Sequence, residues 1–219
     1  MVSTASAVEI VYPDSDGRPM DDNTIQYQYI ITIQVGLDAL FSHDPNVFVA
    51  GDLLWYPVQG QPNLNKAPDV LVAVGRPKGE RGSYKQWEEG NSAPQVVFEI
   101  LSPSNTASEM REKRKFYKQY GVEEYYEFDP ESGTLEVWQR EGRFFRWIAF
   151  EDEWRSPRLG VTLRVEDGKL NLYGPDGKKF LRPVETVAQR EQAEARAEVA
   201  EARAASLAAQ LRALGIEPV

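Results

Sequence analysis

The clearest feature of the hydrophobic pattern is a pair of short apolar runs that each carry one acidic residue. The first covers residues 68–74 and contains Asp69, and the second covers residues 96–101 and contains Glu99. Both runs are rich in β-branched residues and are bounded by turn formers, which is typical of short buried strands. A carboxylate on a buried strand is costly unless it is paired or binds a metal. The pattern therefore predicts two buried strands whose carboxylates need partners.

Helical periodicity occurs in two segments on either side of these strands. Apolar residues recur at helical spacing from Ile25 to about Phe41, behind a capping candidate at Asn23 or Thr24. After the Glu99 run, residues 106–109 fit a capping box, and Gly121 is a natural C-terminal glycine. We therefore expect one helix before the two strands and a second helix between residue 106 and Tyr120.

Further strand-like segments complete the pattern. They cover residues 47–56, the two arms of a hairpin at 125–128 and 134–138, and the stretches 146–150, 161–165 and 170–173. Residues 75–94 hold four glycines and several charges and predict a long loop or lid. Strands that alternate with helices in this order predict an α/β domain with a mixed sheet.

The composition changes from about Glu185 onward, where alanine, glutamate and arginine dominate. Alanine or leucine recurs every seven residues at 193, 200, 207 and 214, and again at 197, 204 and 211. This heptad pattern predicts a core domain over residues 1–183 and a C-terminal helix over 184–219, which forms a homodimer through a coiled coil. Because the seam is mostly alanine, docking on a neighbour and a solvated single helix remain alternatives.

Composition excludes several kinds of site. The 219-residue chain has no cysteine, which rules out disulfides, thiolate zinc sites and cysteine nucleophiles. Its single histidine, His43, excludes a multi-histidine metal site, and the Ser-His-Asp-Pro context favours a surface loop over a catalytic triad. No signal-like start and no window of about 20 apolar residues is present, so a soluble, cytoplasmic protein without a membrane segment is expected. The net charge of −9 means that nucleic-acid binding would need a local basic patch.

Such a patch follows the second acidic strand. Residues 109–118 hold five basic and two acidic residues, a local net charge of +3. If the two strands pair, Asp69 and Glu99 converge at one end of the sheet, and oxygen ligands without histidine or cysteine favour Mg²⁺ or Mn²⁺. Carboxylates, a divalent cation and a lysine are the minimal set for phosphodiester hydrolysis. The residue pattern alone leaves open whether the two acids bind metal or are only structural.

The order of these blocks resembles a known family. The blocks are residues 67–70, 98–104, 113–117 and 121–126, followed by Asp129-Pro130. Over about residues 20–175 they resemble the bacterial Uma-two family of endonucleases, within the PD-(D/E)XK, restriction-endonuclease-like superfamily. The resemblance implies a restriction-endonuclease-like mixed β-sheet flanked by helices, and Mg²⁺- or Mn²⁺-dependent hydrolysis of a nucleic acid, DNA above all. The alanine-rich C-terminal helix lies outside it.

The resemblance also implies site residues. Asp69 and Glu99 become the metal-binding carboxylates. The superfamily pattern places a lysine two residues after the second acid, where this chain has Leu101. Lys113 on the following helix is the best replacement, and Lys115 is the alternative. The expected catalytic set is thus Asp69, Glu99 and Lys113.

Other candidates carry weaker signals. Asp52 is a possible third metal-binding acid, with a turn or capping role as the alternative. Tyr117 is expected in the core, while Lys78, Arg81 and Lys85 are expected either to contact a DNA backbone or to lie in a solvated mobile loop. A catalytically inactive DNA-binding or assembly module with the nuclease fold is the main alternative to an endonuclease. An RNA-directed or nucleotide-hydrolysing enzyme is a third hypothesis.

Overall fold

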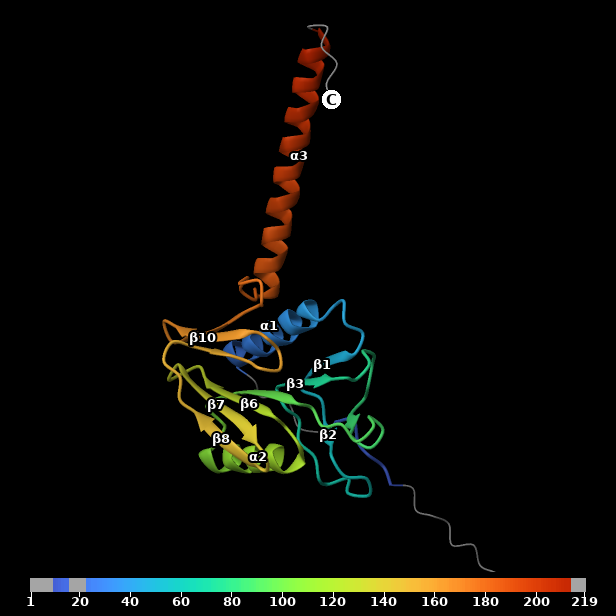
Figure 1. Cartoon of the computed structure of the whole chain (residues 1–219), viewed down its shortest axis with the longest axis vertical. Coiled ribbons are helices and arrows are strands. Elements are labelled where there is room, and N and C mark those ends of the chain that lie inside the picture. Colours follow the sequence, from blue (N-terminus) through green and yellow to red (C-terminus); the bar gives the residue numbers. More distant parts are fainter. Residues whose placement is uncertain (1–9, 16–22, 214–219) are drawn as a thin grey trace, which may run out of the picture. The chain divides into compact units, whose positions relative to one another are not determined.

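The protein has a mixed α/β architecture. The computed structural model describes residues 10–15 and 23–213. By its contacts the chain divides into two compact units, residues 1–180 and residues 181–219. The first unit contains all the strands and the first two helices, and the second contains helix α3 (Pro183–Ala213) (Figure 1).

A six-stranded sheet forms the centre of the first unit. In spatial order its strands are β1 (Val47–Gly51), β3 (Val70–Val74), β5 (Val96–Ile100), β6 (Glu124–Asp129), β7 (Thr134–Glu141) and β8 (Phe144–Ile148). All neighbours are antiparallel except β5 and β6, which are parallel. A parallel pair needs a crossover connection, and helix α2 (Ala107–Tyr120) supplies it. The predicted mixed sheet is confirmed.

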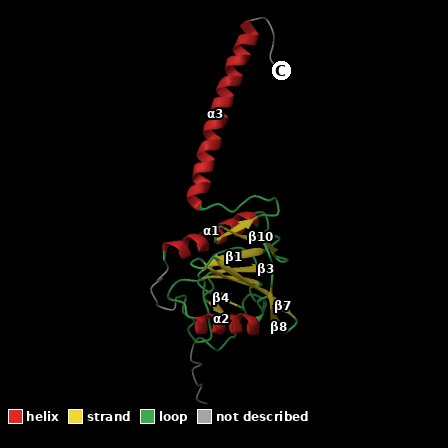
Figure 2. Cartoon of the chain, turned by 90° about the vertical axis from the view of Figure 1, so that its left-hand side faces the viewer, coloured by secondary structure: helices red, strands yellow, loops and turns green. Residues whose placement is uncertain are grey.

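Helices cover both faces of this sheet, α1 (Thr24–Leu40) on one side and α2 on the other (Figure 2). On the α1 face, Ile33 and Leu37 belong to a buried cluster with sheet residues such as Val72 and Phe98. On the α2 face, an aromatic-rich cluster includes Tyr117. Because side chains alternate along each strand, a residue next to one that points toward α1 points toward α2.

The helix boundaries follow the predicted caps. Asn23 caps α1, since its side chain accepts from the backbone N–H groups of Ile25 and Gln26. Thr106 caps α2 by accepting from the N–H of Glu109 at 3.2 Å. Gly121 ends α2 with a φ of 112°, a left-handed conformation that glycine adopts without the steric cost of a Cβ.

Two small sheets flank the central one. The first pairs β2 (Trp55–Tyr56) with β4 (Tyr84–Lys85) in parallel, and the second is antiparallel, in the order β11 (Lys169–Tyr173), β10 (Thr162–Glu166), β9 (Glu153–Arg155). Leucine residues of β10 and β11 join the cluster on the α1 face, so this second sheet extends the core there.

The segment 75–94, predicted to be a loop or lid, packs against the core. Tyr84 of β4 is fully buried. The guanidinium of Arg81 lies 3.9 Å from the ring centre of Phe48 and pairs with Glu89 at 2.6 Å. Arg81 is therefore held by protein contacts, and its expected place in a solvated mobile loop is wrong. Lys78 pairs with Asp38 on the surface at 2.6 Å.

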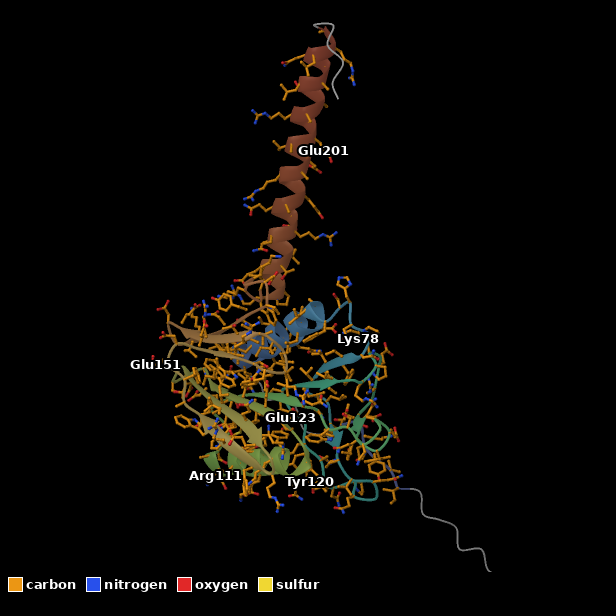
Figure 3. All side chains as sticks on the ribbon, viewed as in Figure 1. Lys78, Arg111, Tyr120, Glu123, Glu151 and Glu201 are labelled. Carbon is orange, nitrogen blue, oxygen red and sulfur yellow. The ribbon has the colours of Figure 1, made fainter. Side chains whose placement is uncertain are left out.

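Helix α3 is exposed along its length. None of its described side chains is buried, and side chains project around the helix at the level of Glu201 (Figure 3). Among the described helices of the chain, none combines the length and the apolar character needed to cross a membrane.

Candidate active site

The register of the central sheet brings Asp69 and Glu99 together. Val70 of β3 is the antiparallel partner of Phe98 of β5, and one further step along both strands places Asp69 opposite Glu99. Because Val70 and Phe98 face α1, the two acids share the α2 face. The backbone N–H of Ile100 donates to Asp69 Oδ2 at 2.6 Å, which fixes the carboxylate beside Glu99.

Glu99 is almost completely buried, and two side chains of α2 form hydrogen bonds with its carboxylate. Lys113 Nζ lies 2.7 Å from Glu99 Oε2, and the Tyr117 hydroxyl donates to Glu99 Oε1. Lys113 and Tyr117 are four residues apart and therefore lie on the same face of the helix. The predicted core position of Tyr117 is correct, and the structure adds that its hydroxyl holds one of the candidate acids.

Burial and charge oppose each other at these groups. Burial raises the pKa of Glu99, while the ammonium of Lys113 and the hydroxyl of Tyr117 counteract the rise. Burial by itself would lower the pKa of Lys113, but the negative charges of Glu99 and Asp69 outweigh it and raise that pKa. Lys113 consequently stays protonated near neutral pH and acts as a fixed positive charge.

A pocket of about 410 Å³ opens at this end of the sheet. Its charged lining residues are Asp52, Lys66, Asp69, Glu99, Glu109 and Lys113. The three residues expected to form the catalytic set thus line one pocket, together with the third candidate acid. Ser102 and Ser104, which follow β5, also line it and share a hydrogen bond of 2.8 Å between their hydroxyl groups.

Of the weaker candidates from the sequence, Asp52 lies at the pocket, whereas Lys115 and His43 lie on the surface. Asp52 follows β1 in a left-handed conformation with a φ of 46°, and its N–H donates to the carbonyl of Asp69 at 3.2 Å. Lys115 is on the outside of α2, where its side chain is 70% exposed and pairs with Glu112. His43 is an exposed turn residue, as predicted. Of the two lysine alternatives, only Lys113 lies in the pocket.

Beside the pocket lies a row of charged groups that the sequence analysis missed. Glu127 of β6 is the register partner of Glu99 on one side and of Glu136 on the other. Arg114, the neighbour of Lys113 on α2, lies 3.3 Å from Glu127 and 3.5 Å from Glu136. Helix α2 therefore carries two adjacent basic residues: Lys113 pairs with Glu99, and Arg114 pairs with Glu127 and Glu136.

One sequence signal could have revealed this row. Glu127 occurs in an aromatic strand, Tyr125-Tyr126-Glu127-Phe128, which has the same form as the acid-bearing apolar run around Glu99. The pattern predicted only a hairpin there. Glu127 and Arg114 meet because α2 packs on the sheet. The periodicity of a single sequence does not reveal that packing.

Gln26 is a further residue that sequence reasoning missed. It lies in the first turn of α1, lines the same pocket and is 5% exposed. Its Nε2 donates to the backbone carbonyl of Ile100 at 2.9 Å. Its Oε1 is buried and has no hydrogen-bond partner among the described residues.

The donor set fits a hard divalent cation. Asp69 and Glu99 offer carboxylate oxygens, and a magnesium ion is commonly held by one or two carboxylates with water completing its shell. Within the described ranges, no three acidic or histidine side chains lie close enough together to hold a metal ion. The pocket therefore suits a cation that keeps several neutral ligands and does not suit a dense carboxylate cage.

Comparisons with known proteins identify the family of the chain. No curated protein matches the chain. Among solved structures, it is similar to a crystal structure of "a putative nuclease belonging to DUF820 from Anabaena variabilis ATCC 29413", with 14% identity, a TM-score of 0.49, and coverage of 68% of this chain and 82% of that one. Residues 19–166 match the Uma2 family, described as "Putative restriction endonuclease". Since the match spans more than half of the sequence and includes the whole pocket, the chain belongs to the Uma2 family.

Proposed function

We propose that this protein is a Mg²⁺- or Mn²⁺-dependent endonuclease that hydrolyses phosphodiester bonds, with DNA as its substrate. The observation that carries the proposal is the convergence of Asp69, Glu99 and Lys113 in one pocket. Membership of the Uma2 family supports the same class of chemistry.

Each residue has a distinct part in this proposal. Asp69 and Glu99 would hold the cation, which, when bound, would polarise the phosphate and lower the pKa of a bound water. Lys113 keeps its positive charge because two acids raise its pKa, so it stabilises negative charge on phosphate oxygens and does not act as a base. Tyr117 holds Glu99 in place through its hydroxyl group.

The test is cleavage of a supercoiled plasmid, and of matched DNA and RNA oligonucleotides, by the full chain with Mg²⁺ or Mn²⁺. Asp69→Asn keeps the size of the side chain and removes its charge, so we expect the cleavage rate to fall by about 10²–10³-fold. Circular dichroism checks that the fold is retained.

Asp176→Asn is the matched control, because Asp176 lies in an exposed turn and pairs with Lys178. This variant is expected to cleave at the wild-type rate. Wild-type protein that cuts no nucleic acid with either metal would contradict the endonuclease proposal. Salt-dependent DNA binding in that case would favour the inactive binding module.

We also propose that α3 forms a parallel coiled coil between two copies of the chain. The seam consists of residues 193, 197, 200, 204, 207, 211 and 214, of which the last lies outside the described residues. None of the seam residues within the described helix is buried. In a parallel pair, Arg196 of one helix meets Glu201 of the other, whereas an antiparallel pair brings like charges together. Charge complementarity therefore favours the parallel arrangement.

Leu207→Asp tests this pairing in the full chain. Leu207 is 52% exposed, so the change has little to disturb in a single helix but places a charge in the seam of a pair. We expect the mass measured by light scattering to fall from two chains to one. Ala202→Asp, on the opposite side of the helix, is expected to leave the mass unchanged. A wild-type protein that is already a single chain would refute the coiled coil.

A further inference from the structure

The buried amide of Gln26 faces the candidate active site from the far side of the sheet. Helix α1 covers the face opposite α2, yet Gln26 lines the pocket with Asp69 and Glu99. Its neighbours Tyr27 and Gln28 are exposed, whereas Gln26 is 5% exposed. Its position near the start of α1, where Asn23 fixes the helix end, brings it to the end of strand β5.

The hydrogen bond to Ile100 fixes which atom of the amide is which. A backbone carbonyl can only accept, so the group 2.9 Å from the Ile100 oxygen must be the NH₂ of Gln26. The remaining atom is then the amide oxygen, Oε1. It is an acceptor in a buried position without a partner among the described residues.

A buried acceptor of this kind is stabilised by a ligand that carries a positive charge or a hydrogen-bond donor. Most buried polar atoms in proteins have a partner, and an exception at a functional site points to an ion or a water molecule. Lys113, which lines the same pocket, does not meet this need, because Oε1 has no hydrogen-bond partner among the described residues. The proposed cation site does, since its two carboxylates leave room for neutral oxygen ligands.

We propose that Oε1 of Gln26 supplies a neutral oxygen ligand to the divalent cation held by Asp69 and Glu99. The inference rests on the proposed function, because it assigns a further residue to the same metal site. It makes α1 part of the active site, to which α2 contributes Lys113 from the other face of the sheet. The Ile100 carbonyl anchors the NH₂ of the amide and leaves its oxygen, on a residue that lines the pocket, without a protein partner among the described residues.

The test measures Mn²⁺ binding to the full chain without nucleic acid, by the loss of the free Mn²⁺ signal in electron paramagnetic resonance. Gln26→Glu replaces the neutral ligand by a charged one and is expected to bind Mn²⁺ about tenfold more tightly. Gln26→Leu removes the ligand and is expected to bind about tenfold more weakly. A purely structural role predicts a different result for glutamate: a carboxylate cannot donate to the Ile100 carbonyl, so Mn²⁺ binding would be unchanged or weaker.

Gln28 provides the matched control, because it is exposed on the same helix. Gln28→Glu adds the same charge outside the pocket and is expected to bind Mn²⁺ as the wild type does. If Gln26→Leu does not fold, Gln26→Glu still tests the proposal. Tighter Mn²⁺ binding by this variant would support a ligand role for Gln26, and unchanged binding would refute it.

The two proposals fail in different ways. Wild-type protein without Mn²⁺ affinity would overturn the metal site and with it the proposed function. Wild-type binding that is lost in Asp69→Asn but not strengthened in Gln26→Glu would overturn the role of Gln26 alone. Tighter binding in Gln26→Glu, with Gln28→Glu unchanged, would support it.

Discussion

Lys113→Met is expected to abolish metal-dependent cleavage and to lower the free energy of unfolding by about 3 kcal/mol. Methionine keeps the length of the side chain but removes its charge, which leaves Glu99 buried beside Asp69 without its ammonium partner. Glu99 is only 2% exposed at the side chain, so water is a poor replacement for that partner. Breaking one half of a buried ion pair costs more than the pair contributes to stability.

A double-mutant cycle separates the two effects. Lys113→Met combined with Glu99→Gln removes both charges, so urea denaturation should show that much of the lost stability returns, while cleavage stays absent. Lys115→Met is the matched control: its side chain is 70% exposed and pairs only at the surface, so a change within about 0.5 kcal/mol is expected. A Lys113→Met protein as stable as the wild type would refute the buried pair.

Trp55→Ala is expected to lower the free energy of unfolding by about 3–5 kcal/mol. Trp55 of β2 is fully buried and packs directly against α2. Its ring is stacked with Tyr117 at 6.2 Å and meets Phe116 edge-on at 5.3 Å, while its indole N–H donates to Gln86 at 3.1 Å. The cavity left by alanine would lie beneath the helix that carries Lys113, so cleavage should fall as well.

The matched control is Trp147→Ala on the outer strand β8. Trp147 is 54% exposed, so the same substitution there should change the free energy of unfolding by no more than about 0.5 kcal/mol. Urea denaturation followed by far-ultraviolet circular dichroism measures both variants. Equal losses at the two positions would contradict the assignment of Trp55 to the support of α2.

Local sequence identified the helices and most of the strands, but it did not predict β4, which lies in the segment expected to be a loop, or β9. The capping box at Thr106 and the glycine at position 121 fixed α2 to within a residue, since caps depend on contacts between neighbours in the chain. Alternation and β-branched residues identified the strands that follow Asp69 and contain Glu99. From the 30-residue spacing, the pairing of these strands was a sound expectation, and the register confirms it.

Only the tertiary structure decided which side chains meet. The sequence left Lys113 and Lys115 as alternatives. The two lysines point to different sides of the helix, and the packing of α2 on the sheet turned Lys113 toward Glu99 and Lys115 toward solvent. The pairing of Arg114 with Glu127 and the reach of Gln26 around the end of β5 were not visible in the sequence at all. Caps and periodicity depend on residues that are close in the sequence. These contacts instead join residues 13 to 74 positions apart, so they form only when both helices pack against the sheet.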